Sequence, residues 1–349
     1  MAGADGGASV QSAAMPFLNT SDGLPLGLGG APLGNLFEAM DDGQAQAMVL
    51  AALQSGCRSF DTAPHYGNGL SEHRLGTGLR GVARSGFMLS SKVGRLLLPR
   101  QDAPSEQNGY VGVLPFVQQW DYSAAGVRRS VQDSLQRLGL ACLDVAYVHD
   151  CDRATHGANY PKVLQQVVQH ALPELRRMQG EGLIGRVGIG VNEVQVCLDV
   201  LQQADLDCLL LAGRYSLIDH SALERLLPLA LQRGVSVALG GVFNSGILAT
   251  GVQEGAVARF NYAPAPAHWV ARVAAIEVLC GQWNVPLRAA AVQFPLAHPA
   301  IAFVVVGAAT AAQWYDTKAM LRHPIAQGFW LDLRRAGLLA DGVPIPGAP

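Results

Sequence analysis

Residues 123–150 read SAAGVRRSVQDSLQRLGLACLDVAYVHD, and in this stretch a helix pattern runs directly into a strand pattern. Ser123 is a residue type that accepts a hydrogen bond from the first turn of a helix, and Gly139 is the residue type that most often follows a last turn. The run at 142–150 is short and apolar, and it ends abruptly in two polar residues. The stretch therefore predicts a helix over 123–140 that is followed by a buried strand.

The same alternation extends outward in both directions along the chain. Short apolar runs predict eight strands, at 25–30, 59–63, 87–93, 142–150, 184–192, 206–216, 235–243 and 300–308. The segments between and after them predict helices at 41–56, 70–80, 123–140, 161–180, 193–204, 221–234 and 268–283, and from Ala311 onward. Parallel strands joined by crossover helices are the simplest fold for such a pattern. We therefore expect the α/β class and a closed (β/α)8 TIM barrel, with extra loops at 94–121 and 249–267 and a C-terminal helix.

The composition is that of a globular enzyme. Half of the 349 residues are apolar, 15% are charged, and the formal net charge is −2. The dense basic runs of nucleic-acid-binding proteins are missing, so we expect a small-molecule substrate and no nucleic-acid partner. No apolar run in the sequence reaches the length of a membrane-spanning helix. We expect residues 1–14 to be a flexible tail and residues 15–349 to be a single barrel domain.

The cysteines and the N-terminus indicate the compartment. Six cysteines are scattered along the chain without a C-x-x-C pair, and several lie in apolar runs. The first residues lack the basic and apolar regions of a secretory signal. These features predict reduced thiols and a cytoplasmic location. The sequence leaves the oligomeric state open.

Polar residues stand at the ends of the predicted strands, where barrel enzymes carry their active sites. Asp61, Lys92 and His149 end the second, third and fourth strands, and Asn192 ends the fifth. Tyr66 lies in the loop that follows Asp61. Lysine occurs at only three positions although 25 residues are basic, which makes a lysine at a strand end informative. Because strand ends converge on the mouth of a barrel, these side chains predict one site for proton and hydride transfer.

Other chemistries are poorly supported. The cluster HDCDRATH at 149–156 crosses a break from strand to loop that would scatter metal ligands, and we expect no metal. The glycine-rich stretch at 27–34 has Pro32 where a dinucleotide fingerprint requires its third glycine. Neither a G-x-S-x-G elbow nor a Tyr-x-x-x-Lys pair occurs. Two alternatives stay open: an aldolase-type barrel with a Schiff base on Lys92, and a barrel that binds without catalysing.

Several segments, in order and spanning roughly residues 25–322, resemble the aldo-keto reductase superfamily. They are FDTAPHYGNGLSEHRLGTGL (60–79), SSKVG (90–94), YVHD (147–150), GIGVN (188–192), AGRYSLID (212–219) and ALGGVFNSGILATG (238–251). Within the superfamily, the last two segments are most similar to the D-threo-aldose 1-dehydrogenases, also called L-fucose or L-galactose dehydrogenases. The pyridoxal 4-dehydrogenases are close relatives of these enzymes.

The resemblance implies a role for each catalytic candidate. Tyr66 is the implied general acid and base, and Lys92 is the cation that lowers the pKa of this phenol from its ordinary value near ~10. Asp61 is implied to hold Lys92 in position. His149 is implied to form a hydrogen bond with the reacting oxygen of the substrate.

The resemblance also implies a nicotinamide cofactor lying extended across the barrel mouth. Asn192 would bind its carboxamide, the loop at 243–248 its pyrophosphate, and the segment at 307–313 its adenosine end. The implied cofactor residues are Asn192, Tyr215, Gly240, Phe243, Asn244, Ser245, Gly246, Leu248, Gly307, Thr310 and Gln313. Two departures from the family pattern stand out: Ala212 replaces a glutamine, and Leu239 is assigned to the strand position that carries a stacking aromatic. Phe243, four residues further on, is the alternative stacking residue.

The resemblance, together with the residues at 307–317, also predicts which cofactor and which substrate are used. No basic residue occurs from Gly307 to Thr317 to meet a 2′-phosphate, which predicts NAD rather than NADP. The implied reaction is oxidation of a cyclic hemiacetal at C1 of an aldose, such as L-fucose, L-galactose or D-arabinose, to its lactone. The alternatives are oxidation of pyridoxal to 4-pyridoxolactone and general reduction of aldehydes or ketones. Loop position predicts substrate contacts from His65, Trp120, Asp150 and Tyr160.

Overall fold

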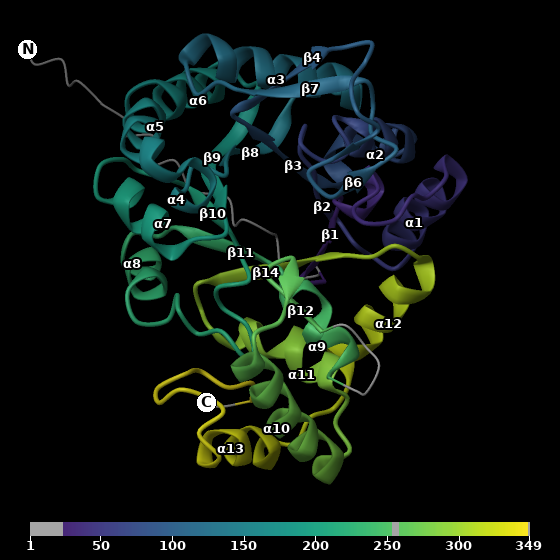
Figure 1. The fold of residues 1–349 in the computed structure, drawn as a ribbon, viewed down its shortest axis with the longest axis vertical. Coiled ribbons are helices and arrows are strands. Elements are labelled where there is room, and N and C mark those ends of the chain that lie inside the picture. The colour runs from purple at the N-terminus through teal and green to yellow at the C-terminus, as the bar shows by residue number, and fades with distance from the viewer. Residues whose placement is uncertain (1–23, 253–257, 348–349) are drawn as a thin grey trace, which may run out of the picture.

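The computed structural model describes residues 24–252 and 258–347, so the predicted tail at 1–14 lies outside the described residues. Eight parallel strands close into a barrel in the order β1-β14-β11-β10-β9-β8-β3-β2 (Figure 1). The barrel strands are β1 (Leu26–Gly29), β2 (Ser59–Asp61), β3 (Met88–Val93), β8 (Leu143–His149), β9 (Ile184–Val191), β10 (Cys208–Ala212), β11 (Ser236–Gly240) and β14 (Ile301–Gly307). All eight predicted strands and the predicted fold class are confirmed. The domain limits of 15–349 stay a prediction.

Helices surround the barrel at every position where the sequence predicts one, and further helices that the sequence did not predict occur at 153–156, 247–250 and 287–293. They are α1 (Asp42–Gln54), α2 (Leu70–Leu79), α3 (Ala124–Leu138), α4 (Arg153–His156), α5 (Tyr160–Gln166), α6 (Leu172–Gly180), α7 (Val194–Leu201), α8 (Leu226–Gln232), α9 (Ile247–Thr250), α10 (Ala267–Trp283), α11 (Leu287–Gln293), α12 (Ala311–Arg322) and α13 (Gln327–Arg335). A π-helical turn at Val167–Ala171 joins α5 to α6 inside the helix predicted at 161–180. None of the described helices is long and apolar enough to cross a membrane.

Local chemistry sets the helix ends. The Asp41 side chain accepts from the amide of Gln44, and the Gln44 side chain accepts from the amide of Asp41, which makes a reciprocal cap before α1. Ser123 caps α3 by accepting from the amide of Gly126. Gly139 ends α3 in a left-handed conformation with φ 67°, as the sequence predicts.

The strands alternate between an inner and an outer face. A small cluster of alternate residues fills the barrel interior: Val145, Tyr147, Cys208, Leu210, Ala238, Phe303 and Val305. Two residues beyond Leu210 and Ala238, at the mouth, are Ala212 and Gly240. Leu239 belongs instead to the larger core that includes the helices. The assignment of Leu239 to the stacking position is therefore wrong, because the alternation makes Gly240 the residue that faces the mouth.

The two long loops contain strands that the sequence analysis missed. Strand β4 (Arg95–Pro99) pairs antiparallel with β7 (Phe116–Trp120), and β5 (Glu106–Gln107) pairs with β6 (Tyr110–Val111). Figure 1 shows β4 and β7 alongside α3. In the second loop, β12 (Arg259–Phe260) pairs with β13 (Ala263–Pro264). These ribbons are antiparallel pairs of short strands, so they fall outside the repeat of parallel strands and helices that identified the barrel.

Helices α2 and α3 approach so closely that one contact requires glycine. A Cβ atom on Gly76 would lie 2.4 Å from the carbonyl oxygen of Leu138. We expect Gly76→Ala to lower the free energy of unfolding by about 1–3 kcal/mol, because backbone atoms must move to admit the methyl group. Gly81→Ala is the control, since a Cβ atom there meets nothing within 4 Å. Thermal and denaturant unfolding measure the difference, and equal stability of the two variants would contradict it.

Candidate active site

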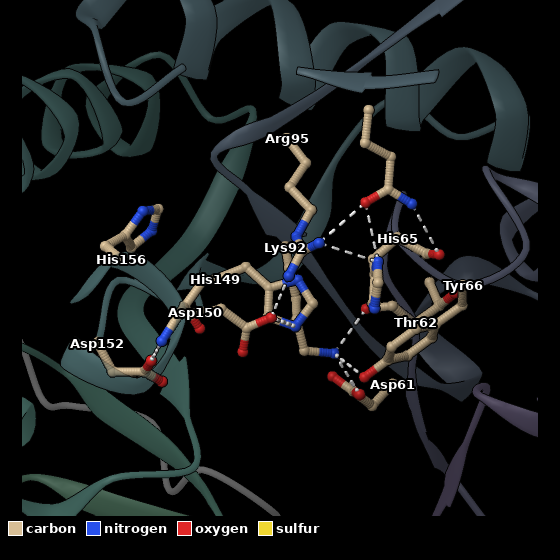
Figure 2. A network of polar contacts seen from close by, with 12 residues as sticks. Asp61, Thr62, His65, Tyr66, Lys92, Arg95, His149, Asp150, Asp152 and His156 are labelled. Carbon is tan, nitrogen blue, oxygen red and sulfur yellow. Dashed lines mark hydrogen bonds and ion pairs between the residues drawn. The ribbon is translucent and has the colours of Figure 1, made fainter. Parts of the chain in front are cut away.

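Lys92 is the centre of a buried cluster at the barrel mouth. Its ammonium group donates three hydrogen bonds: to Asp61 Oδ2 at 2.6 Å, to the Thr62 carbonyl oxygen at 2.9 Å and to the Tyr66 hydroxyl at 3.0 Å. Only 2% of Lys92 is exposed. Figure 2 shows Asp61, Thr62 and Tyr66 gathered around this nitrogen. The structure thus brings together Asp61 at the end of β2, Tyr66 in the loop after it and Lys92 on β3.

The turn after β2 brings Tyr66 back over Lys92. The Tyr66 amide donates to the Ala63 carbonyl, which tightens the turn. Asn68 has a left-handed backbone, with φ 54°, and its side chain donates to the Phe116 carbonyl at 2.7 Å. Gly34 packs against the same turn: a Cβ there would lie 2.5 Å from the Tyr66 carbonyl carbon. Asn68 and the neighbouring Gly34 therefore help to fix the turn that places the Tyr66 phenol.

His149 packs against Tyr66, with ring centroids 6.1 Å apart in an edge-on arrangement. Its Nε2 atom lies 3.4 Å from Asp150 Oδ2. Burial holds the pKa of His149 well below its ordinary value, and the charges of Arg95 and Lys92 act in the same direction. The imidazole is therefore neutral at pH 7, a state in which it can donate one hydrogen bond and accept another.

The expected lowering of the Tyr66 pKa is wrong for the free protein. Burial raises the pKa of the Tyr66 phenol well above its ordinary value, and the Asp61 carboxylate raises it further. The charge of Lys92 is balanced by Asp61, so it does not act as an isolated cation. Tyr66 is consequently a neutral phenol at pH 7, with a donor positioned to stabilise its anion.

Arg95 links the predicted substrate contacts, and the sequence analysis missed it. Its guanidinium pairs with Asp150 and lies 3.1 Å from His65 Nδ1. It also donates to Gln118 Oε1 at 2.9 Å. The guanidinium carbon lies 3.9 Å from the ring centroid of Trp120. Arg95, Gln118 and Trp120 lie on β4 and β7, where Arg95 is directly opposite Trp120, so recognition of that ribbon was the signal needed to find them.

Tyr160 was predicted as a substrate contact, and the structure places it elsewhere. It lies at the start of α5, in the helical layer outside the barrel. Its hydroxyl donates to Asp199 Oδ2 at 2.5 Å, and the guanidinium of Arg153 covers its ring. The tyrosine ring therefore joins α5 to α7, and the prediction fails because the direction of a helical side chain depends on packing that loop position does not reveal.

A cavity of about 740 Å³ opens beside Tyr66 and Asp61. This volume falls in the range of small-molecule and cofactor sites. Eight of the predicted cofactor residues line it: Asn192, Gly240, Phe243, Asn244, Ser245, Gly246, Gly307 and Gln313. His149 and His65 do not line it; they lie beside Tyr66, with His65 and Tyr66 ring centroids 6.0 Å apart.

Three predicted cofactor residues do not line the cavity. Tyr215 is fully buried between the rings of Phe294 and His298. Leu248 packs in the core, and its amide donates to the Phe243 carbonyl. Thr310 caps α12 by accepting from an amide one turn on. A motif gives the order of residues but not the direction of each side chain, which packing decides here.

Other lining residues come from segments that the sequence analysis did not assign to the cofactor. The glycine-rich stretch that failed the dinucleotide pattern contributes Gly29 to Pro32 at the end of β1. Tyr262 lines the cavity from the β12–β13 hairpin. Arg288 on α11 and Asp316 on α12 also line it, and they form an ion pair at 2.9 Å. The NAD prediction considered only the residues from Gly307 to Thr317 and therefore missed Arg288, which lines the cavity from another helix.

The lining fits a dinucleotide. Glycines at seven positions let a ligand approach the backbone: Gly29, Gly30, Gly213, Gly240, Gly241, Gly246 and Gly307. The Oδ1 atom of Asn244 is buried and, within the described residues, has no hydrogen-bond partner. An acceptor of this kind is available to a donor on a bound molecule. The described residues contain no cluster of three or more metal-ligating side chains.

Known proteins share both the sequence pattern and the fold. The family model for aldo/keto reductases matches residues 25–336. A pyridoxal 4-dehydrogenase from Microbacterium luteolum is 41% identical over 328 residues, covering 90% of this chain and 94% of the relative. A D-threo-aldose 1-dehydrogenase from a Pseudomonas species is 36% identical over 318 residues, with the same coverage. A solved aldo-keto reductase from Bacillus halodurans superposes with a TM-score of 0.69 at 23% identity, covering 91% of this chain and 93% of that one. The chain is a member of the aldo/keto reductase family.

Proposed function

We propose that this oxidoreductase converts a cyclic hemiacetal to a lactone with NAD as the hydride acceptor. The observation that carries the proposal is the hydrogen-bonded series from Asp61 through Lys92 to Tyr66, which ends at a phenol beside the 740 Å³ cavity. Two relatives, at 41% and 36% identity, are named for pyridoxal and aldose dehydrogenation, and their names favour a hemiacetal substrate.

Tyr66 acts as the general base in this proposal. Its oxygen accepts the proton of the hemiacetal hydroxyl, while the hydrogen on the same carbon leaves as hydride. A bound nicotinamide supplies the acceptor for that hydride. Lys92 stabilises the phenolate through its hydrogen bond of 3.0 Å, and Asp61 keeps the ammonium in place. Neutral His149 donates a hydrogen bond to the substrate oxygen and so orients the hemiacetal.

Different residues of the cavity would bind different parts of the cofactor. Asn192 would hold the carboxamide near Tyr66. The backbone amides of the turn at Asn244–Gly246 would hold the pyrophosphate, and the unpartnered Oδ1 of Asn244 would accept a hydrogen bond from a ribose hydroxyl of the cofactor. Gln313 and Gly307 would hold the adenosine end. The aldolase-type alternative needs a free Lys92 amine, and the three hydrogen bonds of this ammonium group argue against it.

The raised pKa of Tyr66 predicts how oxidation depends on pH. A base must lose its proton before it accepts one, and burial shifts that loss to alkaline pH. We expect kcat/KM for oxidation to rise by up to about tenfold per pH unit between about pH 6 and pH 9. His149 stays neutral throughout, so its titration adds no step near pH 6.5. A pH profile with NAD measures this, and a flat or falling profile would contradict Tyr66 as the base.

A substrate screen tests the proposal. L-fucose, L-galactose, D-arabinose and pyridoxal are each incubated with NAD, and the absorbance of the reduced cofactor is followed. We expect turnover of at least one hemiacetal and recovery of the corresponding lactone. Pyridoxal is the second candidate for two reasons. A relative that is 41% identical is named for pyridoxal dehydrogenation. In addition, Tyr110 stacks on Tyr66, with ring centroids 5.9 Å apart and planes at 24°, which places aromatic rings next to the catalytic candidate. Reduction of simple aldehydes without any hemiacetal oxidation would overturn the proposal.

A further inference from the structure

The cavity carries an ion pair where it passes between α11 and α12. Ala312, Gln313, Asp316 and Thr317 line it from one face of α12, and Arg288 lines it from the first turn of α11. Arg288 Nε lies 2.9 Å from Asp316 Oδ2, and Arg288 Nη2 donates to Asp316 Oδ1 at 3.2 Å. The side chains are 44% and 40% exposed, so a ligand in the cavity can reach both.

This pair decides the charge of its end of the cavity. The charged residues among those that line the cavity are Asp61, Arg288 and Asp316. Asp61 is committed to Lys92 at the catalytic end. Arg288 is thus the one cation in the described lining, and a two-point contact with Asp316 already occupies its guanidinium. The net charge of this region is zero although an arginine is present.

The position of the pair matches the adenosine half of a dinucleotide. Hydride transfer requires the nicotinamide beside Tyr66, which places the other half toward α11 and α12. NAD and NADP differ there by a phosphate on the 2′ oxygen that carries about two negative charges. Such a phosphate binds well to a free guanidinium and poorly beside a carboxylate. A 2′-hydroxyl can instead donate a hydrogen bond to the carboxylate.

We propose that Asp316 sets the preference for NAD by holding Arg288 and by repelling a 2′-phosphate, an inference that rests on the proposed use of a nicotinamide dinucleotide in this cavity. Asp316 determines cofactor specificity, and its carboxylate accepts a hydrogen bond from the 2′-hydroxyl of the ribose. Arg288 is a latent phosphate-binding residue that its partner keeps neutralised. Removing the carboxylate alone should convert this region into a site for a phosphorylated ribose.

Equilibrium binding tests the proposal without relying on turnover. Isothermal titration calorimetry compares adenosine 5′-monophosphate with adenosine 2′,5′-bisphosphate on the full chain and on Asp316→Asn. We expect the ratio of the two dissociation constants to shift toward the bisphosphate by at least about tenfold in the variant. Adding Arg288→Met to Asp316→Asn should remove that gain, because the freed guanidinium is its source.

Two further variants keep the result interpretable. Asp133→Asn removes a carboxylate paired with an arginine on α3, a helix that contributes no residue to the cavity lining; its ratio should equal that of the unaltered chain. Asp316→Ser repeats the main test with a different side chain if the asparagine variant folds poorly by circular dichroism. An unchanged ratio in the folded Asp316 variants would overturn the proposal. An equal shift of this ratio in Asp133→Asn would also overturn the proposal.

The outcome separates this inference from the proposed function. NAD is titrated into the unaltered chain in the same series. Binding of NAD with no effect of Asp316 on the bisphosphate ratio refutes the specificity role and leaves the dehydrogenase proposal standing. Absence of NAD binding refutes the proposed function, and with it the role of Asp316.

Discussion

Replacing Tyr66 with phenylalanine should reduce turnover by at least about 10²–10⁴-fold while NAD binding stays within about twofold of the unaltered protein. The change removes one oxygen, whose hydrogen bond is the 3.0 Å contact from Lys92. The ring keeps its neighbours, because Tyr110 and His149 pack against its faces and edge rather than its hydroxyl. The loss therefore falls on proton transfer and not on the shape of the cavity.

Two measurements together decide the Tyr66 prediction. Steady-state kinetics give kcat, and calorimetry gives the dissociation constant for NAD. Tyr315→Phe is a matched control, since this tyrosine is 44% exposed on α12 and does not line the cavity. Retention of most activity by Tyr66→Phe would remove this residue from the proposed chemistry. Equal loss of NAD binding would instead show that the phenol acts mainly in holding the cofactor.

Lys92→Met should lower both catalysis and stability. The side chains of Lys92 and Asp61 are 2% and 7% exposed, so the variant leaves a buried carboxylate without its cation. Breaking a buried pair from one side costs about 3–5 kcal/mol of folding free energy. Loss of the donor to the phenolate should also reduce kcat by about 10²–10³-fold. Kinetics and denaturant unfolding measure the two effects separately.

A double variant separates these two roles of Lys92. In Lys92→Met with Asp61→Asn, both charges are gone, so part of the lost stability should return. Activity should not return, because the phenolate still lacks its donor. Lys162→Met is the control, since this lysine is exposed on α5, and it should leave both quantities unchanged. Recovery of activity in the double variant would show that Lys92 only neutralises Asp61.

The barrel and its catalytic centre could be predicted because both depend on short-range patterns. Apolar runs of strand length, each followed by a helix, define the repeat, and polar residues that end those runs must meet at one rim. Asp61 and Lys92 satisfy that condition, Tyr66 lies in the loop that follows Asp61, and the structure brings the three within hydrogen-bonding distance. His149 ends β8 as expected and packs edge-on against Tyr66.

The predictions from the sequence that were wrong concern features that depend on tertiary packing. Tyr160 and Tyr215 lie near the right elements, but neighbouring side chains turn them away from the cavity. Arg288 reaches the cavity from a position 28 residues before Asp316, so no local window could reveal it. The direction of the Tyr66 pKa shift depends on burial, which outweighs the nearby cation and has no counterpart in the order of residues.

The candidate site draws its residues from two separate parts of the fold, the barrel strands and the inserted ribbon of β4 and β7. This separation has a consequence for how substrate specificity can change in evolution. Lys92 and Asp61 belong to the closed sheet, whereas Arg95, Gln118 and Trp120 belong to β4 and β7, which pair only with each other. Mutations that lengthen or rebuild this ribbon would alter the wall beside Asp150 without moving Lys92 and Asp61. Lineages that inherit the same barrel could therefore acquire new substrates while retaining one reaction.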